Sequence, residues 1–268
     1  MLRAHRGSAA AEYLTGLGVR SLPRATSPFD PGYDPATLAS HLDQSGHLLA
    51  ALKLSMAGWM LAGERATRAK LEAARSHSVP TVAGGSSFEV AVAQRRLREY
   101  LGLCAELGFD RIECGDGFTE MGLPPRTVVG LAHAHGLGVQ FEVGKKHAGA
   151  LERHAAEALV RQGCEWLEAG AGEIVVEARE SARDVGAFRA DGVLDVEIAE
   201  RFAAAFGIDR VSFEAPAKAS QFALIDRLGP TVRLSNVRLE EVLRVEGYRR
   251  GLHSDAFGNT RLRPVAVR

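Results

Sequence analysis

Charged side chains recur near the carboxyl ends of short apolar runs in this sequence. Four runs carry a glutamate at or near that end: Glu113, Glu142, Glu177 and Glu214. Another run holds Lys53 in its middle, and Lys145-Lys146 follows the run that contains Glu142. Carboxylates suit a hard divalent ion such as Mg²⁺, whereas lysine binds phosphate or carboxylate groups and can donate a proton. These residue types predict a site for an anionic substrate and a metal ion.

The scarcity of lysine makes its positions informative. Only five of the 33 basic residues are lysine, and Lys53, Lys145 and Lys146 are three of them. A charge inside an apolar strand is costly unless it is paired, and a buried lysine nearly always has a partner. Alternatively, each acidic residue is a solvated loop charge or an acid that favours a helix dipole. Five consecutive strand ends with such charges are less expected by chance, which favours one shared site.

The elements that must position these residues follow a repeated pattern from about residue 79 onward. A short apolar run, a loop and an amphipathic stretch alternate, and the runs have the length and Val, Ile, Phe or Leu content of buried parallel strands. The runs are Val79–Ala83, Arg111–Cys114, Gly138–Val143, Glu173–Glu177, Arg210–Glu214 and Thr231–Leu234. Less clear strands, Ser21–Phe29 and His47–Met56, precede them, with a helix that starts at Asp34-Pro35 between them.

Eight strands that alternate with helices predict a single-domain α/β fold, the (βα)8 TIM barrel. We expect the barrel over residues 21–268 and an amino-terminal extension over residues 1–20. Among the helices, apolar residues at helical spacing predict one from Ala93 to Gly108. An open doubly wound sheet is the alternative, but Gly16-Leu17-Gly18 and Gly170-Ala171-Gly172 do not continue as GxGxxG after a strand.

A barrel gathers the carboxyl ends of its strands at one mouth, where enzymes of this fold place their chemistry. We expect the segment Leu234–Val237 to end the last strand and open the last helix. Backbone N–H groups there, with Ser235 and Asn236, would form a phosphate site, and a plain helix cap is the alternative. His133 and His135 lack the spacing of a zinc site, and no GxSxG motif indicates a serine hydrolase.

Composition narrows the class of protein further. The chain has 268 residues, 33 basic and 33 acidic, so its formal net charge is zero. Nucleic acids and anionic membranes both require a basic face, which argues against either as a partner. The three cysteines form no CxxC motif, and no apolar run approaches the roughly 18 residues of a membrane span. With no apolar signal peptide at the start, we expect a cytoplasmic protein.

Several segments resemble a known family in order over about residues 48–258. The most specific are Val143-Gly144-Lys145-Lys146 and Glu177-Ala178-Arg179-Glu180-Ser181. The others are Gly84-Gly85-Ser86-Ser87-Phe88-Glu89, Leu107-Gly108-Phe109-Asp110 with Glu113 and Asp116-Gly117, Phe213-Glu214-Ala215-Pro216, and Arg249-Arg250-Gly251-Leu252 with Asp255 and Phe257. Together they resemble the phosphosulfolactate synthase family.

The resemblance implies a Mg²⁺-dependent (βα)8 lyase that adds sulfite to phosphoenolpyruvate and gives (2R)-phospho-3-sulfolactate, on one route to coenzyme M. Sulfite would attack the methylene carbon, charge would build up on the carboxylate, and an acid would protonate the carbon that carries the phosphate. By resemblance, the general acid is Lys146, with Lys145 as the substitute. The resemblance also implies that Lys53 and Arg179 bind the substrate anions and that the pool of Mg²⁺ ligands is Glu113, Glu142, Glu177 and Glu214. The candidate substrate-binding residues further include Gly85, Ser86, Ser235 and Asn236. A homo-oligomer is also implied.

Departures from the family pattern keep other functions open. The family usually has Lys-Phe-Gly-Trp-Gly-Thr where this chain has Lys53-Leu54-Ser55-Met56-Ala57-Gly58, and the lost glycines change the loop over the pocket. Ala182, Ala217 and His253-Ser254-Asp255-Ala256 also differ from the usual residues. One alternative is a relative that adds another nucleophile to phosphoenolpyruvate or to a related enol or acrylate acceptor. The other is a non-catalytic homologue with a stress-related role, like the plant heat-stress-associated members of the family.

Overall fold

The eight strands close into a barrel of parallel strands, as the sequence predicts. The computed structural model describes residues 9–264. The strands follow one another around the barrel in chain order, and β8 pairs with β1 to close it. They are β1 (Thr26–Asp30), β2 (Leu52–Leu54), β3 (Thr81–Ala83), β4 (Arg111–Gly115), β5 (Gly138–Val143), β6 (Glu173–Val176), β7 (Val211–Glu214) and β8 (Arg233–Arg238). The fold is a single-domain (βα)8 TIM barrel, which confirms the prediction.

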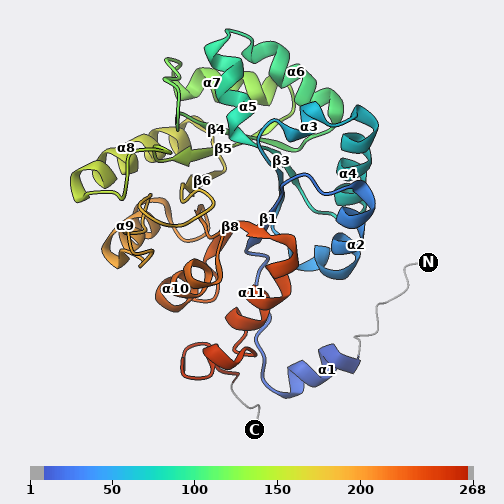
Figure 1. Cartoon of the computed structure of the whole chain (residues 1–268), viewed down its shortest axis with the longest axis vertical. Helices are drawn as coiled ribbons and strands as arrows, with labels where there is room; N and C mark the ends of the chain where they lie inside the picture. The colour runs from blue at the N-terminus through green and yellow to red at the C-terminus, as the bar shows by residue number, and fades with distance from the viewer. Residues whose placement is uncertain (1–8, 265–268) are drawn as a thin grey trace.

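Helices form a ring around the barrel (Figure 1). The α-helices are α1 (Ala9–Gly16), α2 (Pro35–Ser45), α3 (Gly58–Leu61), α4 (Glu64–Ser76), α5 (Gly85–Ala93), α6 (Leu97–Leu107), α7 (Pro125–Ala134), α8 (Arg153–Ala169), α9 (Val196–Phe206), α10 (Lys218–Leu228) and α11 (Val242–Arg249). Short 3₁₀ helices are η1 (Gly46–Leu48), η2 (Leu239–Glu241) and η3 (Ser254–Ala256).

Local sequence signals explain where several helices begin and end. The Asp34 side chain accepts hydrogen bonds from the backbone N–H groups of Ala36 and Thr37, so it caps α2 as the Asp34-Pro35 pair predicts. Gly108 ends α6 in the left-handed conformation, with φ +95°. The helix predicted from Ala93 begins later, at Leu97, because Ala93 closes α5 and Arg95 has a positive φ that interrupts the helix.

Helix α1 lies outside the barrel. None of its residues is buried, and Figure 1 shows it apart from the ring of helices. Arg20, which follows it, donates a hydrogen bond to the backbone oxygen of Arg261. Residues 1–8 of the expected amino-terminal extension lie outside the described residues. Within residues 9–264, every helix is too short or too polar to cross a membrane.

Strand alternation sends apolar side chains outward and polar ones into the barrel. In β4, Ile112 and Cys114 are fully buried in the apolar core, while Glu113 between them faces the interior. The apolar core therefore lies between the strands and the helices, where Phe141 stacks on Trp166 with ring centroids 4.2 Å apart. The barrel interior is polar, because every second side chain of a strand points inward and the charged residues occupy those positions.

The interior charges occupy two levels. At the amino-terminal level, Arg233 forms a double hydrogen bond with Glu173, at 2.9 Å and 3.1 Å, and Arg111 lies 3.7 Å from the same carboxylate. Bidentate pairs of this kind are both strong and directional. The glutamates predicted to carry the chemistry lie at the opposite level, toward the carboxyl ends of the strands.

The predicted end of the last strand is wrong. Strand β8 continues to Arg238, and α11 begins at Val242, so Ser235 and Asn236 lie within a strand and not at a helix start. The pairing of β8 with β1 passes from Ser27↔Ser235 to Pro28↔Val237, which leaves Asn236 as an extra residue with φ +53°. A β-bulge lets the strand continue past a residue that does not pair, and this explains the difference.

Candidate active site

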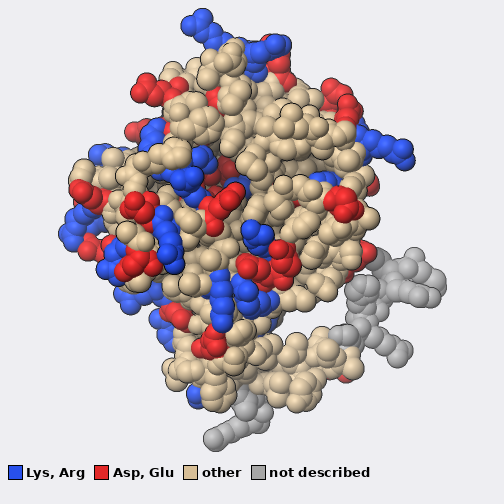
Figure 2. Space-filling view, viewed as in Figure 1, with Lys and Arg blue, Asp and Glu red and all other residues tan. Residues whose placement is uncertain are grey.

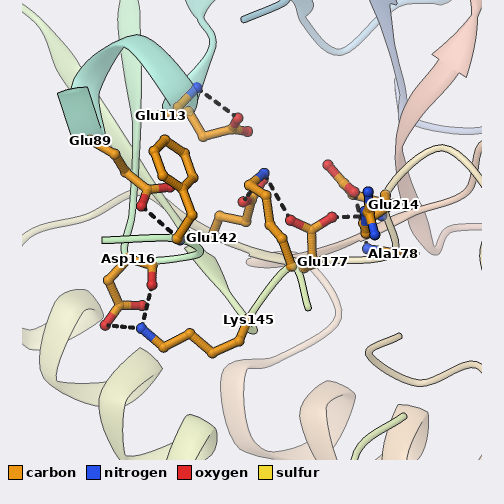
Figure 3. A network of polar contacts seen from close by, with 12 residues as sticks. Glu89, Glu113, Asp116, Glu142, Lys145, Glu177, Ala178 and Glu214 are labelled. Carbon is orange, nitrogen blue, oxygen red and sulfur yellow. Dashed lines mark hydrogen bonds and ion pairs between the residues drawn. The ribbon is translucent and has the colours of Figure 1, made fainter. Parts of the chain in front are cut away.

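Four buried glutamates form the carboxyl-terminal level of the barrel interior. Glu113, Glu142 and Glu214 belong to β4, β5 and β7, and Glu177 follows β6 directly. Each is at most 4% exposed. Ligand oxygens of Glu142, Glu177 and Glu214 all lie within 4.8 Å of one another. Figure 3 shows these three carboxylates grouped and Glu113 set apart from them. The structure thus brings the predicted acidic residues together at one mouth of the barrel.

Lys53 bridges two of these carboxylates. Its Nζ atom lies 3.1 Å and 3.2 Å from the two oxygens of Glu113 and 3.3 Å from Glu214 Oε1. Glu113 also accepts hydrogen bonds from Gln140 Nε2 at 2.9 Å and from the backbone N–H of Gly85 at 3.1 Å. Because these donors occupy both oxygens of Glu113, it acts as the partner of Lys53 and stands outside the three-carboxylate group.

The two adjacent lysines point to different places. Lys146 Nζ lies 3.2 Å from Glu142 Oε1 and 2.9 Å from Glu177 Oε2. Lys145 Nζ instead donates to the backbone oxygen of Asp116 and lies 3.5 Å from its Oδ2 atom. In Figure 3 the Lys145 side chain turns toward Asp116, away from the grouped carboxylates. The predicted general acid therefore reaches the site, whereas its predicted substitute does not.

A cavity of about 580 Å³ opens at this level. Its lining includes five of the six predicted substrate-binding residues: Lys53, Gly85, Ser86, Arg179 and Asn236. Figure 2 shows acidic and basic side chains side by side around the central hollow of this face. The sixth, Ser235, is 5% exposed and lies deeper in the barrel, with Ser27 and Ser212 around a separate small space. Asn236 and Ser235 are adjacent in β8, but only Asn236 lines the main cavity.

Three lining residues hold left-handed backbone conformations. Met56, Arg179 and Asn236 have φ of 52°, 54° and 53°; the first two follow β2 and β6, and Asn236 is the bulge residue within β8. Such conformations cost about 1–3 kcal/mol in residues other than glycine, and they concentrate at functional sites. At Arg179 the backbone N–H donates to Glu177 Oε1 at 2.6 Å, which offsets part of that cost and ties the segment to the carboxylate group.

Burial and the proximity of other carboxylates raise the pKa values of the three grouped glutamates. Burial, with the neighbouring Glu177 and Glu113, raises the pKa of Glu142 to about 8. Burial and Glu214 raise the pKa of Glu177 to about 7, and burial also raises the pKa of Glu214.

The pKa values of Glu113 and Lys146 shift in the direction that favours the charged form of each group. Burial alone would raise the pKa of Glu113, but the Lys53 charge and its hydrogen bond outweigh it and lower that pKa. Burial likewise disfavours the Lys146 ammonium, but Glu142 and Glu177 raise its pKa above the ordinary value. Lys146 is therefore a protonated group next to carboxylates that resist ionisation.

The three-carboxylate group fits a divalent cation. Four buried carboxylates face two ammonium groups, Lys53 and Lys146, so full ionisation leaves two negative charges (four minus two) without a counter-charge. Glu177 Oε2 is buried, and its close partner is the Lys146 ammonium at 2.9 Å. Mg²⁺ prefers oxygen ligands, and its charge of +2 would balance the two excess negative charges. Within the described residues, Glu142, Glu177 and Glu214 are the one group of metal-ligating side chains this close together.

Sequence reasoning did not single out Gln140, Phe29 or Arg238. Gln140 fixes Glu113, and Phe29 and Arg238 line the cavity. Gln140 could have been predicted from the alternation of side chains, because it stands two residues before Glu142 on the same strand face. Arg238 could not have been predicted, because it lies beyond the predicted end of β8.

Comparison with known proteins identifies the family. The model of (2R)-phospho-3-sulfolactate synthase (ComA) matches residues 23–255, most of the chain. The chain belongs to this family. The phosphosulfolactate synthase of Methanocaldococcus jannaschii is 29% identical over 230 residues, which cover 85% of this chain and 92% of that protein. The phosphosulfolactate synthase of Methanothermobacter thermautotrophicus is 30% identical over 241 residues, with 88% and 92% covered. That of Bacillus subtilis is 30% identical over 189 residues, with 70% and 75% covered.

Solved structures with low sequence identity share the fold. A type I 3-dehydroquinate dehydratase from Clostridium difficile superposes with a TM-score of 0.54 at 15% identity, covering 88% of this chain and 96% of that one. KGPDC from Streptococcus mutans superposes with a TM-score of 0.53 at 13% identity, covering 88% and 98%. These likenesses support the barrel alone. Membership of the phosphosulfolactate synthase family makes the chain an enzyme of the lyase class, as predicted, while the roles of individual residues stay predictions.

Proposed function

We propose that this phosphosulfolactate synthase family member adds sulfite to phosphoenolpyruvate in a Mg²⁺-dependent reaction that gives (2R)-phospho-3-sulfolactate. One observation carries the proposal: in a chain of this family, Lys146 lies within 3.2 Å of two members of a buried three-carboxylate group, at the mouth of the barrel. An acid and a cation site are thereby held next to each other in a cavity that an anionic substrate can enter.

The reaction requires charge stabilisation and one proton. The sulfur lone pair of sulfite forms the new carbon–sulfur bond at the methylene carbon, and the π electrons of the carbon–carbon bond move toward the substrate carboxylate. A proton then adds to the carbon that bears the phosphate, so one C–S and one C–H bond form and no group leaves. Preorganised positive charge near the carboxylate lowers the energy of this electron-rich species.

Glu142, Glu177 and Glu214 are the residues that would hold Mg²⁺. When bound, the ion supplies positive charge that offsets the charge that develops on the substrate carboxylate. The chain itself must keep the three carboxylates close before the ion arrives. The backbone does so in part, because Ala178 N–H donates to Glu214 Oε2 at 3.0 Å and Arg179 N–H donates to Glu177 Oε1 at 2.6 Å.

Lys146 is the proton donor in this proposal. Its raised pKa keeps Nζ protonated at neutral pH, which is the form that a general acid needs before the reaction. Lys53 and Arg179 line the same cavity and would bind the phosphate and carboxylate anions. Because Glu113 and Glu214 hold Lys53 on two sides, its ammonium is fixed before the substrate binds. The Lys53 side chain therefore loses little further conformational freedom in the complex.

A direct assay tests the proposal. Purified protein is incubated with phosphoenolpyruvate, sulfite and Mg²⁺, and the consumption of phosphoenolpyruvate and the appearance of a new phosphorus resonance are followed by ³¹P NMR. We expect consumption that depends on sulfite and that stops when EDTA removes the metal. Consumption that does not depend on sulfite, or none at all, rejects the proposed reaction.

A second candidate keeps the acceptor chemistry and changes the nucleophile. It is favoured by Met56, which lines the cavity in a left-handed conformation where the family usually has a glycine-rich loop. The assay is therefore repeated with thiols, sulfinates and phosphite in place of sulfite, and a nucleophile with a higher kcat/KM than sulfite would replace the first proposal. The cytoplasmic location, the homo-oligomer and the role in coenzyme M synthesis stay predictions.

A further inference from the structure

Glu89 is a buried carboxylate that lies outside the cavity lining. It belongs to α5 and is 1% exposed. Its Oε2 atom accepts three hydrogen bonds from the loop between β4 and α7: from the backbone N–H of Phe118 at 3.0 Å, and from the backbone N–H and hydroxyl of Thr119 at 2.9 Å and 3.0 Å. A buried carboxylate is costly without such donors, so this contact fixes the loop to α5.

The loop held by Glu89 packs on the stem of Lys146. A Cβ atom at Gly117 would lie 3.0 Å from Lys146 Cε and 3.1 Å from Lys146 Cγ, closer than ordinary van der Waals contact. The Gly117 backbone oxygen also accepts a hydrogen bond from the Lys146 N–H at 3.1 Å. Gly117 is not among the left-handed glycines, so a glycine is needed here for space and not for backbone conformation.

The other lysine holds the beginning of the same loop. Lys145 Nζ contacts the backbone oxygen of Asp116 and lies 3.5 Å from Asp116 Oδ2, which also accepts a hydrogen bond from Gln162 Nε2 at 3.1 Å. Figure 3 shows Glu89 and Lys145 on either side of the loop. The segment 116–119 is therefore held by α5 at one end and by the residue next to Lys146 at the other.

We propose that Glu89, Gly117 and Lys145 are positioning residues for Lys146, because they hold segment 116–119 against its stem and so keep its ammonium between Glu142 and Glu177. The proposal rests on the proposed function, in which Lys146 donates the proton. A lysine side chain has several rotatable bonds, so without lateral support it would sample several positions. A misplacement of about 1 Å can cost about 100-fold in rate, which is the scale of effect expected here.

Kinetic comparison of Glu89→Ala, Glu89→Gln and Gly117→Ala tests the positioning role. Glu89→Ala removes the acceptor and Gly117→Ala pushes on the Lys146 stem, so we expect kcat to fall by about 100-fold in each. KM for phosphoenolpyruvate should stay close to the wild-type value, because the anion-binding residues are untouched. Glu89→Gln keeps an oxygen acceptor of the same length and should retain most of the wild-type kcat.

Asp110 provides a matched control. It is an acidic residue that also accepts hydrogen bonds from a threonine, from the backbone N–H of Thr81 at 2.7 Å and from its hydroxyl at 2.8 Å. It precedes β4, at the opposite end of the barrel from Lys146. Asp110→Ala should lower the melting temperature as Glu89→Ala does but leave kcat unchanged. Equal loss of kcat in the two variants would mean that Glu89 acts through general stability, and would overturn the proposal.

Hydrogen–deuterium exchange supplies a readout that does not depend on activity. In Glu89→Ala we expect faster amide exchange both in residues 116–119 and in residues 144–148, because the Lys146 N–H is bonded to Gly117; Asp110→Ala should change neither segment. Faster exchange in residues 116–119 alone would show that the loop does not hold Lys146 and would overturn the proposal. If the wild-type protein fails to consume phosphoenolpyruvate with sulfite, the proposed function fails, and the exchange comparison still decides whether the loop holds Lys146.

Discussion

The side chains of Lys145 and Lys146, adjacent in the segment after β5, contact different parts of the molecule. Lys146 Nζ lies 2.9 Å from Glu177 Oε2 in the barrel mouth, and Lys145 Nζ lies 3.5 Å from Asp116 Oδ2 in a neighbouring loop. Both residues follow the end of β5, and Lys146 lies in a turn, so one of two identical side chains reaches the cavity and the other contacts the loop. In the proposed mechanism, Lys146 therefore donates the proton and Lys145 supports the loop.

Replacing the two lysines should have unequal effects. Lys146→Ala removes the proposed general acid, and we expect kcat to fall by about 10²- to 10⁴-fold, the usual contribution of a positioned acid. Added primary amines should restore part of that activity by entering the space left by the side chain. Lys145→Ala should lose less activity and should not respond to amines. If amines rescue Lys145→Ala instead, the assignment of the two lysines is reversed.

Removing one carboxylate of the three should weaken metal activation. Glu214→Gln takes one oxygen ligand from the group of Glu142, Glu177 and Glu214. We expect the Mg²⁺ concentration for half-maximal activity to rise by about tenfold or more, since even residues that only support metal ligands cost 10–100-fold in affinity. Glu173→Gln is the matched control, because it removes a barrel glutamate that pairs with Arg233 at the far level. A similar rise in both variants would argue against this metal site.

The metal-free protein should lose stability as pH rises through the neutral range. The folded-state pKa is raised from 4.5 to about 8 for Glu142 and to about 7 for Glu177. Between the unfolded and folded values, the folded state holds protons that the unfolded state releases, so the free energy of unfolding falls with increasing pH. Urea unfolding in EDTA between pH 5 and pH 8 measures this slope. Glu142→Gln, which cannot ionise, should flatten it, and an unchanged slope would contradict the assigned cause.

Lys53 should contribute to stability as well as to substrate binding. It is 8% exposed and pairs with Glu113 and Glu214, so Lys53→Met leaves two buried carboxylates without their partner. Loss of one member of a buried ion pair typically costs about 3–5 kcal/mol, and we expect a decrease of that order in the free energy of unfolding. The double variant Lys53→Met/Glu113→Gln should recover part of the stability and none of the activity. Recovery of activity would show that the Lys53 charge has no part in substrate binding.

The eight-stranded barrel could be predicted because most of its strands, from β3 onward, are defined by local sequence. Runs such as Gly138–Val143 are short and apolar, and the loops and amphipathic stretches between them allow parallel pairing only. The same pattern located the site, because the carboxyl ends of parallel strands meet at one mouth. A glutamate at each of several strand ends therefore implied a shared pocket before any distance was known.

Three features depended on the tertiary structure. The bulge at Asn236 extends β8 and removes the helix start predicted there, and it is set by pairing with β1. The distinction between Glu113 and the three-carboxylate group comes from donors on three other segments, Lys53, Gly85 and Gln140. The supporting role of Glu89 arises because α5 lies beside the loop after β4. Residue types and spacing determined which chemistry could occur at the barrel mouth, whereas contacts between segments distant in the chain decided which side chains face each other, because hydrogen bonds and ion pairs act over only a few ångströms.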